Sequence, residues 1–173
     1  VQFAGGVPVC HSLGNFVFWQ ETDLLYRRLG YLVKAGVAGE GLSHIEIIPY
    51  EIGPECLRLL EGADRVEFFE ALRKVSLPLA QPGGIADAWH GFLRYYGIRG
   101  FRDEMAMILA RMDREPAKGA AMMRNRIATM QHREHWIDAM TRIMDGTIDE
   151  SPQWAYDLAV EWLTRKRPAQ GAR

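Results

Sequence analysis

The residues of this chain that could do chemistry are few and lie far apart in the sequence. His11 and Asn15 flank a glycine turn that follows a short apolar run. His132 and His135 are three residues apart, so on a helix they would share one face. Two such histidines could bind a metal, but a metal site needs three or four ligands, and no cluster of Cys or Asp accompanies them. We therefore expect a polar helix face at this pair.

The two cysteines give little information about redox compartment. Cys10 and Cys56 are too few for a disulfide framework. Two free thiols suit a reduced protein, and a single bridge suits an oxidised one. Cys10 belongs to an apolar run, where a lone cysteine is usually inert packing rather than a nucleophile. We expect no catalytic role for it.

Composition excludes several classes of protein. The chain has 173 residues, of which 48% are hydrophobic and 25% charged, and its net charge is -1. These values argue against a disordered chain and against a strongly basic nucleic-acid binder. No apolar run approaches the ~20 residues of a spanning helix, so we expect no membrane segment. Val1 is not a start methionine, and residues 1–9 lack the charged region of a signal peptide, which we interpret as a chain entered midway.

A change of composition near Pro82-Gly83-Gly84 predicts two domains. Residues before it are rich in Gly, Val and Ile, whereas all eight methionines follow it. Unbranched residues suit helices, and β-branched residues suit strands. We predict an α/β domain over 1–80, built of strands plus one helix. An all-α segment over 85–167 and a disordered tail over 168–173 would complete the chain.

The expected elements of the first domain are three strands and a helix. Apolar or alternating runs predict the strands, at 7–11, 31–37 and 42–52. Pro49 favours an edge position or a bulge, because proline cannot donate a ladder hydrogen bond. Asp64 is the expected N-cap of the helix, with Glu67 at the capping-box spacing.

Apolar periodicity predicts helices throughout the second segment, over 86–96, 101–112, 118–145 (as one helix or two) and 151–166. Its methionines and tryptophans fall at helical spacing and indicate a core, or a face for a partner helix. Arg124 and Arg126, with Lys118 and Arg133, could bind an anionic polymer or phosphate. The acids interspersed among them favour a solvated helix face instead.

The string Ser12–Phe16, which reads Ser-Leu-Gly-Asn-Phe, is the most specific in the chain. It resembles the closing motif of the bacterial capsule-synthesis CapA family, also called poly-γ-glutamate biosynthesis proteins. A strand ending in Ile48-Pro49 and a helix closing at Leu72–Ser76 resemble the same family, so the likeness covers about residues 1–77. Residues 19–30 depart from the usual short linker of the family. The helical half resembles no family that we can name.

The resemblance implies a fold similar to calcineurin-like metallophosphatases, which is a sandwich of two sheets flanked by helices. Such proteins hold a pair of divalent cations about 4 Å apart on Asp, His and Asn ligands. In the CapA family these ligands precede the Ser-Leu-Gly-Asn-Phe motif. The resemblance therefore implies no catalytic residue, metal ligand or cofactor within this chain, and a divalent metal pair in the intact protein. His11 and Asn15 would line a loop next to that active site. The alternative for His11 is a strand-end histidine with local hydrogen bonds, and the alternative for Asn15 is fixation of the loop backbone alone.

By this resemblance the intact protein would serve capsule or poly-γ-glutamate biosynthesis at the bacterial cell envelope. Its mechanism would be metal-dependent phosphoester hydrolysis or a non-hydrolytic part in polymer assembly. An anionic polymer or capsule-assembly proteins would be its partners, with no nucleic acid. The alternative is a non-catalytic helical module for binding or homo-oligomerisation. An enzyme built from His11, His132 and His135 is the weakest hypothesis, because no recognisable motif would bring them together.

Overall fold

The computed structural model describes residues 2–39 and 41–167, which divide into two units. Unit 1 comprises the residues up to Gly84 together with those from Glu161 onward, and unit 2 comprises Ile85–Val160. The described residues are 56% helical and 21% strand, and they include five α-helices and two small sheets. The chain is thus mixed α/β, as its sequence predicts. The expected disordered tail, 168–173, lies outside the described residues.

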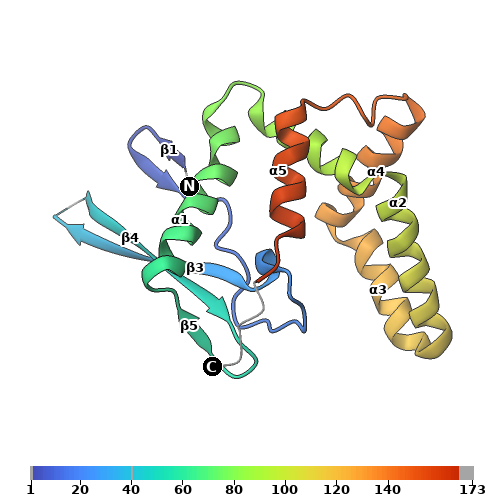
Figure 1. The fold of residues 1–173 in the computed structure, drawn as a ribbon, viewed down its shortest axis with the longest axis horizontal. Coiled ribbons are helices and arrows are strands. Elements are labelled where there is room, and N and C mark those ends of the chain that lie inside the picture. The colour runs from blue at the N-terminus through green and yellow to red at the C-terminus, as the bar shows by residue number, and fades with distance from the viewer. Residues whose placement is uncertain (1, 40, 168–173) are drawn as a thin grey trace. The chain divides into compact units, whose positions relative to one another are not determined.

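Unit 1 contains two antiparallel sheets. The smaller pairs β1 (Gln2–Ala4) with β2 (Val7–Val9). The larger has the order β3-β4-β5, formed by β3 (Leu29–Ala38), β4 (Gly41–Ile52) and β5 (Leu57–Leu59). Figure 1 shows β3 and β4 as a long hairpin. The three expected strands are present, although β2 ends two residues early and β3 begins two residues early.

Pro49 occupies the central strand of its sheet rather than an edge strand. Its carbonyl accepts a hydrogen bond from the Leu60 N–H at 2.9 Å. The N and C=O of one strand residue face the same side, so the missing N–H faces the side of β5. The pairing of β5 with β4 runs only from Tyr50 to Ile52. Pro49 therefore lies just beyond the last paired residue, where a ladder donor is not needed.

The helix α1 (Gly62–Ser76) packs on the larger sheet and closes the core of unit 1. Tyr31 of β3 and Phe68 of α1 meet edge to face at 6.2 Å, and Leu60 is buried with them. The predicted N-cap was wrong, because the helix begins earlier and its N-cap is Glu61. The Asp64 carboxylate instead accepts a hydrogen bond from an arginine of β5 at 2.8 Å.

A buried carboxylate joins the sheet to the last described residues. The Glu51 side chain is only 3% exposed and forms ion pairs with Arg28, Arg58 and Arg167. The pairs to Arg28 and Arg58 are each 2.8 Å long. Arg58 also contacts Asp64. We call these five residues the Glu51 cluster.

The C-terminal residues of unit 1 return to a loop that precedes the larger sheet. The Leu25 N–H, in the short 3-10 helix η1 (Leu25–Arg27), donates to the Arg165 carbonyl at 3.0 Å. The Arg167 N–H donates to the Asp23 carbonyl at 3.2 Å. A second 3-10 helix, η2 (Leu77–Ala80), follows α1. Unit 1 is therefore made of two separate stretches of the chain.

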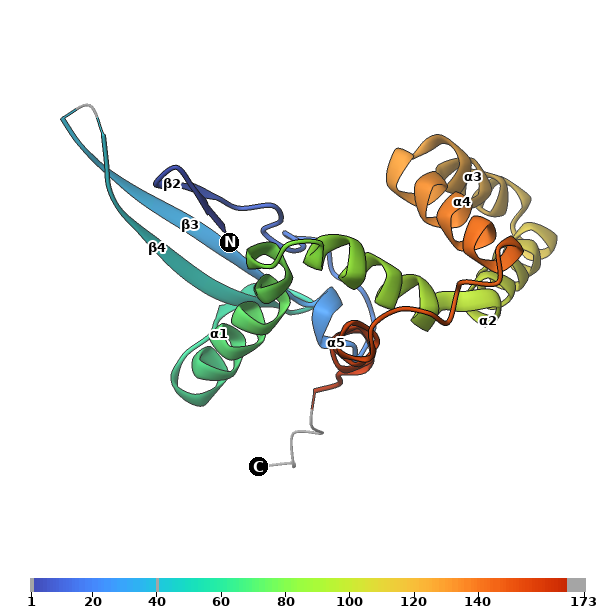
Figure 2. The same ribbon diagram turned by 90° about the horizontal axis from the view of Figure 1, so that it is seen from above.

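Unit 2 is helical, and Figure 2 shows α3 beside α4. Its helices are α2 (Gly84–Arg114), α3 (Pro116–Ala128), α4 (Met130–Met144) and α5 (Gln153–Thr164). α5 runs on into unit 1. The backbone of α2 is non-helical at Gly97, where φ is 50°, so the two helices predicted over 86–96 and 101–112 are continuous except for this break. The extended backbone of Thr129 separates α3 from α4, so the 118–145 region forms two helices.

The core of unit 2 contains Leu93, Ile108 and Ala139, each fully buried. The methionines are only partly in this core, because Met107 and Met144 are 51% and 85% exposed. None of the described helices is both long enough and apolar enough to span a membrane.

Candidate functional site

The segment Ser12–Phe16, which we call the turn motif, docks against the first residues of β3 and the end of β4. The Tyr31 N–H donates to the Leu13 carbonyl at 2.9 Å, and the Tyr31 hydroxyl donates to the Ser12 carbonyl at 2.7 Å. The Tyr50 hydroxyl donates to the Asn15 carbonyl at 2.7 Å. Burial raises the pKa of both tyrosines, that of Tyr31 to about 12, so both hydroxyls stay protonated donors at neutral pH.

Gly14 lies against the backbone of β3, and the space admits no side chain. A Cβ at Gly14 would lie 2.7 Å from the Leu29 carbonyl oxygen and 2.8 Å from the Gly30 Cα. Its φ of +81° is also one that L side chains rarely adopt. Two independent constraints therefore select glycine at this position.

We predict that Gly14→Ala lowers the free energy of unfolding of unit 1 by about 2 kcal/mol, because it adds both backbone strain and a backbone clash. Urea unfolding followed by circular dichroism measures the loss. Gly5→Ala is the matched control: Gly5 also has a positive φ, but a Cβ there meets nothing within 4 Å. Equal losses in the two variants would contradict the predicted role of close packing.

His11 and Asn15 both make local contacts. His11 is exposed, and its Nε2 lies 3.1 Å from Oε1 of Gln2. The Asn15 side-chain amide donates to the Arg27 carbonyl at 2.8 Å. Asn15 thus ties the turn motif to η1 with its side chain and to β4 with its carbonyl. Among the described residues, no group of three or more His, Cys, Asp or Glu side chains could hold a metal ion.

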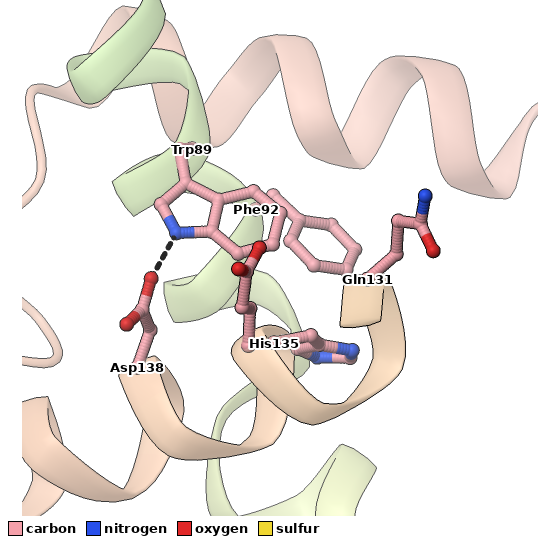
Figure 3. Close-up of a pocket in the computed structure, with 6 residues that line it drawn as sticks. Trp89, Phe92, Gln131, His135 and Asp138 are labelled. Atoms are coloured by element: carbon pink, nitrogen blue, oxygen red, sulfur yellow. Dashed lines mark hydrogen bonds between the residues drawn. The ribbon is translucent and has the colours of Figure 1, made fainter. Parts of the chain in front are cut away.

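A pocket in unit 2 lies between α2 and α4, and we call it the helical pocket (Figure 3). Its volume is about 630 Å³, and it is open to solvent. α2 contributes two aromatic side chains and α4 contributes four polar ones; the lining residues are Trp89, Phe92, Gln131, Glu134, His135 and Asp138. Both helices belong to unit 2, so this unit forms the pocket by itself.

The aromatic wall of the pocket is fixed in position. Trp89 and Phe92 stack with ring centroids 5.3 Å apart. The Trp89 indole N–H donates to the Asp138 carboxylate at 2.7 Å, which joins the two helices. The His135 ring contacts Phe92 at 4.9 Å and Tyr96 at 4.1 Å. Its Nε2 is buried and has no hydrogen-bond partner among the described residues.

A partly buried polar network adjoins His135 through Tyr96. The Glu104 carboxylate accepts hydrogen bonds from the Tyr96 hydroxyl at 2.7 Å and from the Trp136 indole at 3.0 Å. It also pairs with Arg126 at 2.6 Å, and Arg126 in turn contacts His132 Nε2 at 2.7 Å. The two histidines thus have different surroundings: His132 touches the guanidinium, whereas His135 touches aromatic rings.

The environment shifts the pKa values of this network in consistent directions. Burial lowers the pKa of His135 and of His132, and the Arg126 charge lowers both further. Burial and the hydrogen bond to Glu104 raise the pKa of Tyr96. Burial would raise the pKa of Glu104, but the hydrogen bonds from Tyr96 and Trp136 and the Arg126 charge outweigh it and lower that pKa. At neutral pH we therefore expect neutral histidines, a protonated tyrosine and an ionised carboxylate.

The lowered pKa of His135 predicts that unit 2 loses stability as pH falls. Below pH 6.5, the ordinary histidine pKa, this residue binds a proton in the unfolded chain, whereas in the folded protein it stays neutral until the pH reaches its lower pKa. The free energy of unfolding therefore decreases as the pH falls through this range. Urea unfolding followed by tryptophan fluorescence between pH 7 and 5.5 measures this dependence. His135→Phe keeps an aromatic ring and should reduce the slope, while His132, whose pKa is also lowered, contributes the remainder. An unchanged slope in the variant would assign the effect to other groups.

Sequence reasoning singled out His135 but assigned it to a polar helix face. The structure places it against three aromatic rings, those of Trp89, Phe92 and Tyr96. These rings are spaced three and four residues apart, which places them on one face of α2. This spacing was the signal in the sequence for an aromatic surface that could cover His135. Arg126 was likewise expected on a solvated face, yet its side chain is 22% exposed and paired with Glu104.

The helical pocket offers hydrogen-bond acceptors and aromatic faces, and its described lining contains no lysine or arginine. That combination suits binding of a positively charged or aromatic group more than group transfer. Comparison with protein families, with curated proteins and with solved structures finds no match to this chain.

Proposed function

We propose that this chain is the C-terminal part of a CapA-like protein that takes part in capsule or poly-γ-glutamate biosynthesis. The observation that carries the proposal is the docking of the turn motif. Ser12 and Asn15 accept hydrogen bonds from two tyrosines, Gly14 fits where no side chain could, and Phe16 packs edge to face on Tyr50 at 6.1 Å. A string whose residues each have a specific contact supports a family resemblance better than a string in an open loop.

We propose further that the larger sheet of unit 1 is part of a metallophosphatase-like sandwich. α1 covers one side of this sheet. Large apolar side chains remain exposed near it, including Phe16, Val17 and Phe18 at 60–68% and Val37 at 74%. Further sheet structure would bury such residues. In this proposal the divalent metal ligands precede the turn motif, and the metal pair supports phosphoester hydrolysis or a non-hydrolytic role in polymer assembly at the cell envelope.

The coding sequence upstream of Val1 tests the proposal. The family resemblance expects Asp-x-His, Gly-Asn-His and His-x-His strings, the last ending shortly before Val1. If they are present, the complete protein should bind about two divalent cations, and hydrolysis of bis(p-nitrophenyl) phosphate would distinguish the enzymatic from the non-hydrolytic role. A start codon within a few residues of Val1 would overturn the proposal.

A helical binding or oligomerisation module is the second candidate function. The observation that favours it is the exposed apolar surface of the helices of unit 2, where Ile127, Met130 and Ile137 are 55–58% exposed and Met144 is 85% exposed. Contiguous exposed apolar area often marks an interaction surface. Light scattering over a range of protein concentrations tests homo-oligomerisation, and a monomer at every concentration would exclude it.

A further inference from the structure

We propose that the helical pocket binds a small alkylammonium cation between the rings of Trp89 and Phe92 and the carboxylates of Glu134 and Asp138. The inference gives the second candidate function a ligand class. It is independent of the capsule proposal, because every residue that carries it lies in unit 2.

The carboxylates supply the charge complementarity. Glu134 and Asp138 are four residues apart on α4, so they lie on neighbouring turns of one face. Both line the pocket together with the aromatic wall, and Figure 3 shows Asp138 beside Trp89. Asp138 accepts the Trp89 N–H on Oδ2. Glu134 is exposed, and within the described part of the chain neither acid forms an ion pair. Two negative charges with no internal counter-ion therefore face the same space.

The aromatic wall supplies the second kind of contact. A cation over the face of an aromatic ring is attracted by the ring quadrupole, most strongly for tryptophan. The Trp89 ring cannot turn freely, because its N–H is held by Asp138 at 2.7 Å and its face stacks on Phe92. A ligand would therefore meet rings that are already in position, which lowers the entropy cost of binding.

The arginine of the polar network next to the pocket has an acidic partner of its own. Arg126 is paired with Glu104 and contacts His132. His135 stays neutral near pH 7, because burial lowers its pKa, so it adds no positive charge to the pocket. The described lining, with two carboxylates and no lysine or arginine, therefore favours a cation over an anion.

The pocket's size fits a small ligand. Its volume of about 630 Å³ lies within the range of roughly 300–1,000 Å³ typical of small-molecule sites. The site is open and has few anchoring groups, so we expect a dissociation constant in the millimolar range for a simple amine.

Three probes with four carbon atoms each test the proposal: n-butylammonium chloride, n-butanol and sodium butyrate, each titrated at constant ionic strength and pH 7.5. The readout is the indole N–H resonance of Trp89 in ¹⁵N-resolved NMR spectra, assigned with Trp89→Phe. We expect saturable shifts with butylammonium, at least fivefold weaker binding of butanol, and no binding of butyrate. Comparable binding of butanol would show a merely apolar pocket and overturn the proposal.

Matched variants separate the pocket from general charge effects. Glu134→Gln should weaken butylammonium binding about fivefold, because it removes one of the two pocket charges. Glu150→Gln makes the same charge change at an exposed site outside the pocket lining and should leave binding unchanged. Equal affinities in the two variants would overturn the proposal. Neither outcome tests the metal ligands expected upstream of Val1, so this experiment and the test of the capsule proposal are independent.

Discussion

Replacing Glu51 with alanine is expected to lower the free energy of unfolding of unit 1 by about 3 kcal/mol. The Glu51 side chain is 3% exposed and is the common partner of Arg28, Arg58 and Arg167. Its removal leaves three guanidinium groups close together without their shared counter-charge. The side chains of Arg28 and Arg167 are only 19% and 21% exposed, so water replaces the lost partner poorly. Urea unfolding followed by circular dichroism measures the loss.

The same strand provides a control for this prediction. Glu46 of β4 pairs with Lys34 of β3 at 3.5 Å, and both side chains are about half exposed or more. Exposed pairs of this kind contribute about 0–1 kcal/mol, so Glu46→Ala should change stability little. If Glu51→Ala and Glu46→Ala had equal effects, the Glu51 cluster would not be the stabilising contact between the sheet and the returning C-terminal segment.

Replacing Glu104 with alanine is expected to destabilise unit 2 by about 3 kcal/mol. The carboxylate accepts hydrogen bonds from Tyr96 and Trp136 and pairs with Arg126, and its side chain is 16% exposed. The substitution leaves a hydroxyl, an indole N–H and a guanidinium largely buried without an acceptor. Urea unfolding followed by tryptophan fluorescence measures the effect, because Trp136 lies in the network itself.

Glu134→Ala is the control for Glu104→Ala, since it removes an exposed carboxylate from a helix of the same unit. It should change stability by less than about 0.5 kcal/mol. In the Glu104→Ala variant the Tyr96 hydroxyl should also lose its proton at a lower pH than in the wild type, because the Glu104 carboxylate helps to raise the pKa of that hydroxyl. A Glu104→Ala protein as stable as the wild type would show that water satisfies the three donors.

Local pattern predicted most of the elements. Alternating and apolar runs indicated β3 and β4, and helical periodicity indicated α2 to α5, because both signals depend on which face of an element is buried. The start of α1 was predicted in the wrong place, because Asp64 has a side chain typical of an N-cap. In the structure the Asp64 carboxylate instead accepts a hydrogen bond from Arg58. The strands β1 and β5 have three residues each, too few for a period of two to be recognised.

The contacts that build the sites could not be predicted from spacing. Arg126 and Glu104 are 22 residues apart, and Trp89 and Asp138 are 49 apart. Such pairs depend on how helices pack, and local charge pattern suggested a solvated face for Arg126. The resemblance proposed for the turn motif rests on consecutive residues, which can be compared without knowing the fold. Its partners, Tyr31 and Tyr50, gave no sign of their role beforehand.

The path of the chain through unit 1 has a consequence for its synthesis. Leu25 and Asp23 pair with Arg165 and Arg167, and Glu51 needs Arg167 to complete its cluster. Between these partners the ribosome must make the whole of unit 2. Domains generally fold as units during translation, the N-terminal ones first. Here the sheet of unit 1 is synthesised first, but its partners Arg165 and Arg167 are synthesised last. Unit 2 can therefore fold on the ribosome before unit 1 is complete.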